Sequence, residues 1–102
     1  MGNFVTIGQA SAIDEGEMKQ VEVAGTKVAI ANVAGSFYAF GDTCTHLGCS
    51  LSEGHLEETT VTCRCHGSRF DVTSGQVLRG PAQKSEPSYR VEVRGGSLWV
   101  EV

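Results

Sequence analysis

The residues best suited to chemistry stand in two short segments, CTH at residues 44–46 and CRCH at residues 63–66. Each segment offers a thiolate and an imidazole within three or four residues, and sixteen residues separate the segments. Thiolate is a soft metal ligand and imidazole a borderline one. Two loops that each bring one ligand of each kind suit a metal centre with two chemically different ends.

A zinc site is the alternative that these residue types leave open, because two cysteines and two histidines also make a tetrahedral ligand set. Zinc fingers usually group their ligands as Cys-x-x-Cys followed by His-x₃₋₅-His. Here Cys44 precedes His46 in the first segment, and Cys63 precedes His66 in the second. The mixed order argues against a zinc finger.

The segments that must position these ligands have the two-residue alternation of half-buried β-strands. We expect strands at residues 3–7, 19–23, 27–33, 37–40, 89–94 and 97–102. Gly95-Gly96 separates the last two and supplies the positive φ of a two-residue hairpin turn. Only residues 11–18 could hold a helical turn.

This pattern predicts an all-β fold, an antiparallel β-sandwich or barrel that occupies residues 1–102 as one domain. A small subdomain is inserted at about residues 42–70, and it carries all four cysteines and all three histidines. The strands on either side would form the base that holds the two ligand loops.

Composition excludes several other classes of protein. The net charge of −4 makes nucleic acid an unsuitable partner. No apolar run approaches the roughly 20 residues that span a bilayer, and residues 1–6 lack the basic and apolar regions of a signal peptide. We therefore expect a cytoplasmic protein without a membrane anchor. Six of the eight basic residues lie at or after the second ligand segment, either as solvated surface or as a docking pattern for redox partners.

The residues around the ligands, CTHLGC at 44–49 and CRCHGSRF at 63–70, resemble those of the Rieske iron–sulfur family. The resemblance implies a base of β-sheet with a small cluster-binding subdomain and one [2Fe–2S] cluster. Cys44 and Cys63 would bind one iron, and His46 and His66 the other. Mixed ligation gives such clusters potentials of roughly −150 to +300 mV, against about −400 mV for plant-type clusters with four cysteines.

Two further cysteines, Cys49 and Cys65, stand inside the motifs. In the Rieske proteins of cytochrome bc-type complexes, cysteines at these places form a disulfide that joins the cluster loops. The ferredoxins of aromatic-ring oxygenases commonly lack this pair. The resemblance therefore implies a Cys49–Cys65 disulfide, with two inert buried thiols as the alternative.

Other residues would surround the cluster and tune its potential. In the high-potential members, a serine and a tyrosine after the second motif donate hydrogen bonds to cluster sulfur. Ser68 keeps the hydroxyl, whereas Phe70 has none, which implies an intermediate potential. By the same resemblance, further residues would shield the cluster or allow tight ligand loops: Leu47, Gly48, Gly67 and Pro81.

The resemblance implies an electron-transfer protein rather than an enzyme. We expect a monomeric ferredoxin that makes transient contact with a flavin-containing ferredoxin reductase and a terminal oxygenase of the aromatic-ring dioxygenase type, in aromatic hydrocarbon catabolism. Two alternatives stay open: a Rieske subunit or soluble fragment of a quinol-oxidising respiratory complex, and the small subunit of a nitrite-reductase-like enzyme.

Overall fold

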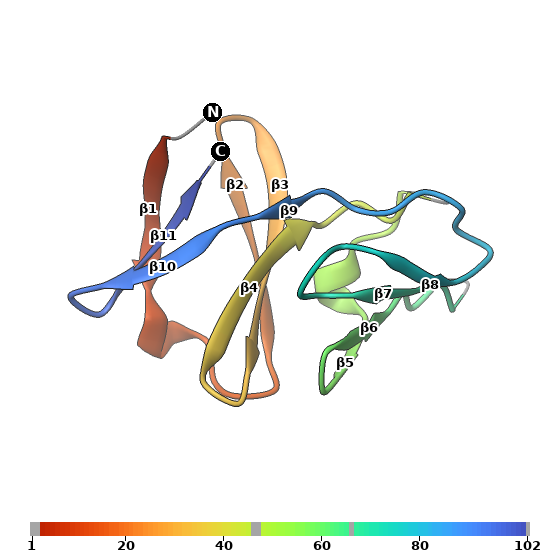
Figure 1. The fold of residues 1–102 in the computed structure, drawn as a ribbon, viewed down its shortest axis with the longest axis horizontal. Coiled ribbons are helices and arrows are strands. Elements are labelled where there is room, and N and C mark those ends of the chain that lie inside the picture. Colours follow the sequence, from red (N-terminus) through yellow and green to blue (C-terminus); the bar gives the residue numbers. More distant parts are fainter. Residues whose placement is uncertain (1–2, 46–47, 66, 102) are drawn as a thin grey trace.

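The computed structural model describes residues 3–45, 48–65 and 67–101. In this part of the chain the strands form three antiparallel sheets, two in a base and one in a smaller unit beside it (Figure 1). This confirms the predicted all-β antiparallel fold. None of the helical segments in these ranges is long and apolar enough to cross a membrane.

The first sheet has the order β1-β11-β10, and its strands are β1 (Phe4–Gln9), β10 (Val91–Arg94) and β11 (Ser97–Glu101). The second has the order β2-β3-β4-β9, with β2 (Met18–Val23), β3 (Thr26–Val33), β4 (Ser36–Gly41) and β9 (Ser88–Tyr89). The third has the order β5-β6-β7-β8, with β5 (His55–Glu57), β6 (Thr60–Thr62), β7 (Arg69–Asp71) and β8 (Val77–Arg79). Short 3-10 turns occupy Ala10–Ala12 and Leu51–Glu53.

The second sheet is the middle layer, because both of its faces are buried. Along β3, Val28 and Ile30 belong to a core shared with the first sheet, whereas Ala29 and Ala31 belong to a core under the third sheet. All four side chains are fully buried. Since successive side chains of a strand point to opposite faces, β3 packs against both other layers. Ala29 and Ala31 face the third sheet. Phe40, which lies opposite Ala29 on β4, packs in the same core.

Local turn chemistry accounts for the hairpins of the base. Gly95 and Gly96 have φ values of 57° and 82° and join β10 to β11, with Arg94 opposite Ser97. A positive φ at both positions is the requirement of a type I′ turn, which suits the twist of paired strands. The predicted Gly95-Gly96 hairpin is therefore confirmed.

Two expectations for the base need correction. The segment expected as one strand at residues 89–94 is divided, because β9 pairs with β4 in the second sheet and β10 pairs with β11 in the first. This segment crosses from one layer to the other at Arg90. The helical turn expected within residues 11–18 is a single 3-10 turn at Ala10–Ala12, and Met18 already begins β2. The third sheet also continues past residue 70, to Arg79 at the end of β8.

Candidate metal centre

The two loops that carry the predicted ligands have the same backbone hydrogen bonds. In the first loop, the Cys44 N–H donates to the Cys49 carbonyl at 2.7 Å, and the Gly48 N–H donates to the Cys44 carbonyl at 2.9 Å. In the second, the Cys63 N–H donates to the Ser68 carbonyl at 2.8 Å, and the Gly67 N–H donates to the Cys63 carbonyl at 3.1 Å. Each loop thus closes on its own cysteine.

The glycines at the fourth position after each cysteine make this closure possible. Gly48 has a φ of 81° and Gly67 a φ of 79°. Residues with a side chain rarely adopt this left-handed conformation, whereas glycine does so at no steric cost. The role expected for Gly48 and Gly67 in tight ligand loops agrees with this backbone conformation.

The loops present two buried sulfurs, one from each. Cys44 is 3% exposed and Cys63 is 2% exposed, and both lie in the core under the third sheet. Cys44 follows the end of β4, and Cys63 follows the end of β6. The base therefore fixes the position of one sulfur, and the third sheet that of the other.

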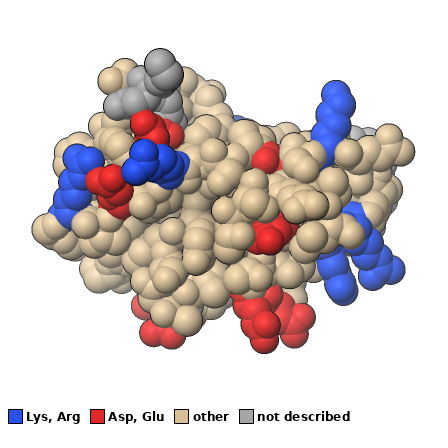
Figure 2. All heavy atoms as spheres, viewed as in Figure 1, with Lys and Arg blue, Asp and Glu red and all other residues tan. Residues whose placement is uncertain are grey.

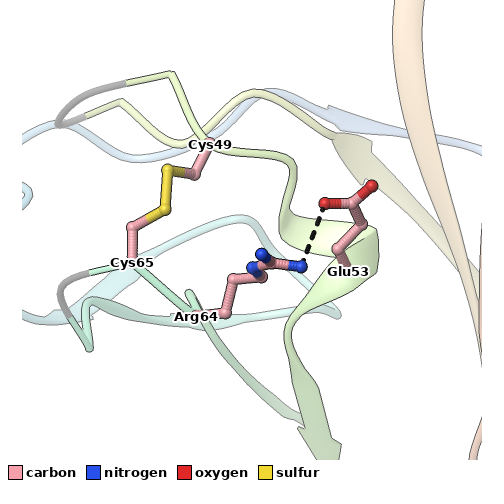
Figure 3. Close-up of a disulfide and its surroundings, with 4 residues drawn as sticks. All are labelled: Cys49, Glu53, Arg64 and Cys65. Carbon is pink, nitrogen blue, oxygen red and sulfur yellow. Dashed lines mark ion pairs between the residues drawn. A yellow bond between two sulfur atoms is a disulfide. The ribbon is translucent and has the colours of Figure 1, made fainter.

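A disulfide between Cys49 and Cys65 joins the two loops (Figure 3). Their Cα atoms are 6.5 Å apart, and the sequence separation is 16. Cys65 is exposed and Cys49 is half-buried. Beside the disulfide, Arg64 forms an ion pair with Glu53 at 3.5 Å. Both of these side chains are largely exposed, so the ion pair adds little to stability.

The cysteine donors fit the sulfur-bound half of a mixed-ligand cluster. The sulfur atoms of Cys49, Cys63 and Cys65 lie within 4.8 Å of one another. This trio is no three-thiolate site, because two of its sulfurs are bonded to each other. Cys44 and Cys63 remain as sulfur donors, one on each loop, which is the number that a Rieske cluster takes from cysteine.

The expected nitrogen ligands, His46 and His66, lie outside the described residues, as does the expected shielding residue Leu47. The remaining histidine, His55, is exposed at the start of β5. It pairs with Thr62 on β6, outside both ligand motifs.

A third segment lies against both loops. The buried hydroxyl oxygen of Ser68 accepts a hydrogen bond of 3.0 Å from the Ala82 N–H. The Thr45 hydroxyl donates to the Lys84 carbonyl at 2.6 Å. Pro81, exposed and joined to Gly80 by a cis peptide bond, lies on this segment. The segment expected to cover the cluster from a third side therefore contacts each ligand loop.

Phe70 lies on β7 directly opposite Val61 and is fully buried. It belongs to the core that also contains Cys44 and Cys63. A phenylalanine at this position supplies packing and no hydroxyl. Ser68, two residues earlier, accepts one hydrogen bond, which leaves its own hydroxyl hydrogen to be donated elsewhere.

Asp42, at the entrance to the first loop, is a functional residue that sequence reasoning missed. Its buried carboxylate accepts hydrogen bonds from the Gln20 side chain, the Ser50 hydroxyl and the Ser52 N–H. Burial raises the pKa of Asp42, but the hydrogen bonds from Ser50, Gln20 and Ser52 outweigh burial and hold this pKa below its usual 3.8. The charged carboxylate therefore ties the first loop to β2.

Glu86 is a second buried acid that sequence reasoning missed. It is 5% exposed, and its Oε2 atom has no hydrogen-bond partner among the described residues. Burial, with a smaller contribution from the nearby Asp42 charge, raises the pKa of Glu86 to about 7. A hydrogen bond from the Thr45 N–H opposes this rise. Glu86 thus connects the segment after Pro81 to a peptide group of the first ligand loop.

The surface charges separate into two groups. Figure 2 shows Lys and Arg side chains at both ends of the molecule, with acidic side chains along its lower side. In the base, Arg90 and Arg94 form ion pairs with Glu92, and Arg90 forms another with Glu101. In the smaller unit, Arg69 on β7 lies directly opposite Arg79 on β8. Like charges in opposite positions of a sheet repel each other.

Comparisons with known proteins agree with this geometry. Residues 3–90 match the model of the Rieske [2Fe-2S] domain. The ferredoxin subunit of 3-phenylpropionate/cinnamic acid dioxygenase from Escherichia coli (strain K12) is 36% identical over 91 residues, which are 88% of this chain and 85% of the relative.

Solved structures share the fold over nearly the whole chain. One is a chain from a complex of reduced oxygenase and oxidized ferredoxin in carbazole 1,9a-dioxygenase, with a TM-score of 0.90 and 34% identity over 95% of this chain and 91% of that one. Another is the plasma membrane Rieske protein PetC3 from Synechocystis PCC 6803, with a TM-score of 0.75 and 27% identity over 96% and 99% of the two chains. The chain therefore belongs to the Rieske [2Fe-2S] domain family and is a Rieske-type ferredoxin.

Proposed function

We propose that this ferredoxin is a one-electron carrier that takes electrons from a flavin-containing reductase and delivers them to the terminal oxygenase of an aromatic-ring dioxygenase system. The observation that carries the proposal is the pair of matched loops, each with one buried cysteine outside the disulfide. The E. coli relative, a ferredoxin subunit of a dioxygenase, supports the assignment. We expect the carrier to act as a cytoplasmic monomer.

The proposed ligands are those of the two motifs. Cys44 and Cys63 would hold one iron of the [2Fe–2S] cluster through sulfur, and His46 and His66 the other through nitrogen. A bound cluster supplies the one-electron redox couple. With two thiolates instead of four, the oxidised centre is close to neutral, so an added electron meets less repulsion than in a plant-type ferredoxin.

The chain's own residues would adjust this couple. A hydroxyl that donates to cluster sulfur favours the more negative reduced state and raises the midpoint. Ser68 is held for this role by the Ala82 N–H, and a hydroxyl that already accepts is a stronger donor. Phe70 lacks the second hydroxyl of the high-potential members. We therefore propose an intermediate midpoint, which Phe70→Tyr should raise.

The side chains near the loops suggest how a partner is recognised. Arg69 and Arg79 are exposed and opposite each other, and Lys84 is exposed on the segment after Pro81. Among the described residues these three cations form no ion pair. Exposed charge of one sign speeds encounter with a complementary surface and makes association sensitive to salt. Small, weak interfaces of this kind are typical of electron-transfer partners.

Reconstitution tests the proposed function. The purified ferredoxin is combined with a flavin-containing ferredoxin reductase and the terminal oxygenase of an aromatic-ring dioxygenase system, and product formation from an aromatic substrate is followed with NADH. We expect turnover that requires the ferredoxin and declines when Arg69→Glu and Arg79→Glu are introduced together. Lys19→Glu together with Lys27→Glu, at exposed positions on β2 and β3, serves as the charge-matched control. Turnover at full rate without the ferredoxin would refute the proposal.

A second candidate is a quinol-oxidising Rieske protein, which the Cys49–Cys65 disulfide and the similarity to PetC3 favour. The resemblance associates such a disulfide with the Rieske proteins of cytochrome bc-type complexes, and PetC3 is a Rieske protein of the plasma membrane. The midpoint separates the two candidates, because quinol oxidation requires a value near the upper end of the roughly −150 to +300 mV range. An intermediate midpoint and no reduction by a quinol would exclude this candidate.

A further inference from the structure

The Cys63 sulfur lies within 4.8 Å of both sulfurs of the Cys49–Cys65 disulfide. A thiolate attacks a disulfide along the S–S axis through a mixed disulfide, and its rate depends on access to one of the bonded sulfurs. A movement of about one ångström would bring the Cys63 sulfur into contact with the disulfide. Cys63 and Cys65 are also close in sequence, because only Arg64 stands between them.

We propose that the Cys63 thiolate exchanges with the Cys49–Cys65 disulfide once iron has left the site, and that this exchange blocks reassembly of the cluster. The Cys63 sulfur bonds to the Cys49 sulfur, the Cys49–Cys65 bond breaks, and Cys65 leaves as a thiolate. One disulfide and one thiolate are present before and after, so the step needs no oxidant or reductant.

The structure favours Cys65 as the leaving group. Cys65 is exposed, so water solvates the thiolate that forms, whereas Cys49 is half-buried. Attack on Cys65 itself would instead link Cys63 to Cys65 across a single residue, Arg64, in a small strained ring. The new Cys49–Cys63 bond closes nearly the same length of chain as the original bond, so the loop entropy changes little.

The consequence is a control of cluster assembly by iron occupancy. Iron held by Cys63 occupies the attacking sulfur and preserves the Cys49–Cys65 bond. Without iron, exchange removes Cys63 from the ligand set and exposes a thiolate at Cys65. A dithiol reductant would then be required before the cluster is rebuilt. This inference rests on the proposed ligand role of Cys63, which the iron and sulfide content of the starting protein tests separately.

Trypsin gives the exchange a clear signature. Cleavage after Arg64 leaves Cys49 and Cys63 on one peptide and moves Cys65 to a short neighbouring peptide, CHGSR. The original disulfide holds these two peptides together. The exchanged disulfide is internal to the longer peptide and releases CHGSR with a reactive thiol.

The holoprotein is stripped of iron by a chelator under argon without a thiol reductant, alkylated with iodoacetamide after increasing times, and digested. We expect the linked peptides to disappear with time and alkylated CHGSR to accumulate. The yield of cluster rebuilt with ferrous iron and sulfide should fall as the linked peptides disappear. Dithiothreitol should restore this yield. Peptides that stay linked through Cys65 at all times would overturn the proposal.

Two controls make the assignment specific. Holoprotein from which iron is removed in the presence of excess iodoacetamide should yield only the linked peptides, because Cys63 is alkylated as soon as iron leaves it. Cys63→Ser lacks the attacking sulfur and should keep Cys49 joined to Cys65 under the same conditions. Release of CHGSR from Cys63→Ser at the wild-type rate would assign the exchange to another thiol and contradict the proposal.

Discussion

Glu86→Gln tests whether the buried acid destabilises the fold at neutral pH. Burial raises the pKa of Glu86 from 4.5 to about 7, so the folded chain keeps this proton at pH values where the unfolded chain has lost it. Below pH 4.5 both states are protonated and Glu86 costs nothing. As pH rises from 4.5 to about 7, unfolding becomes progressively more favourable, because only the folded chain still holds the proton. Above 7 the full cost remains.

The size of the effect follows from the two pKa values. A shift from 4.5 to about 7 corresponds to about 3 kcal/mol, at about 1.4 kcal/mol for each tenfold change in proton affinity. Glutamine keeps the shape and an oxygen that accepts from the Thr45 N–H, but it carries no charge. Its NH₂ group would take the place of the Oε2 atom, which has no hydrogen-bond partner among the described residues. Burying this NH₂ group lowers the unfolding free energy by an amount that does not change with pH, because the amide does not titrate.

The assay is the thermal midpoint of wild type and Glu86→Gln from pH 5 to 8, at one scan rate and with the cluster bound. Between pH 5 and 8, the thermal midpoint of Glu86→Gln should rise relative to that of wild type by up to about 10 °C, at roughly 4 °C per kcal/mol. Glu57→Gln, an exposed glutamate on β5, is the matched control and should give a small constant difference. A Glu86→Gln difference that stays constant with pH would refute the reasoning.

Three other substitutions test the surroundings of the site. Asp42→Asn should lower the unfolding free energy by about 2 kcal/mol above pH 5, because charged hydrogen bonds are lost. This difference from wild type should vanish as pH falls through the lowered pKa of Asp42. A difference in the urea midpoint that does not change with pH would contradict this role of Asp42. Ser68→Ala should lower the redox midpoint by about 40 mV. A net hydrogen bond contributes about 1 kcal/mol, and 100 mV corresponds to about 2.3 kcal/mol for one electron. An unchanged voltammogram would show that Ser68 does not affect the cluster potential. Gly54→Ala should destabilise by about 3 kcal/mol, because its Cβ would overlap the Thr62 carbonyl; wild-type stability in urea would contradict this packing.

Features decided by neighbouring residues could be predicted from the sequence. Gly95-Gly96 predicted its hairpin because two-residue turns depend on local φ values. The strand at 27–33 was predicted because alternation persists over its length, and β3 covers Thr26–Val33. Gly48 and Gly67, each four residues after a cysteine, indicated tight ligand loops for the same local reason.

Features decided by distant packing could not be predicted. The strands β5 to β8 are three residues each, too short for a periodic pattern. Their pairing depends on contacts between segments. The division of residues 89–94 between two sheets likewise depends on which neighbours β9 and β10 find. Asp42 and Glu86 look like ordinary surface acids in the sequence, because their burial arises only when separate segments meet.

A cluster held by two cysteines and two histidines is the central feature of the proposed electron carrier. Pulsed electron paramagnetic resonance of the reduced protein, labelled with ¹⁵N-histidine, measures nitrogen bound to iron directly. We predict strong coupling to two histidine nitrogens, and the loss of one of the two couplings in His46→Cys and of the other in His66→Cys. A reduced protein without histidine coupling, or a colourless protein that holds zinc, would contradict the central claim.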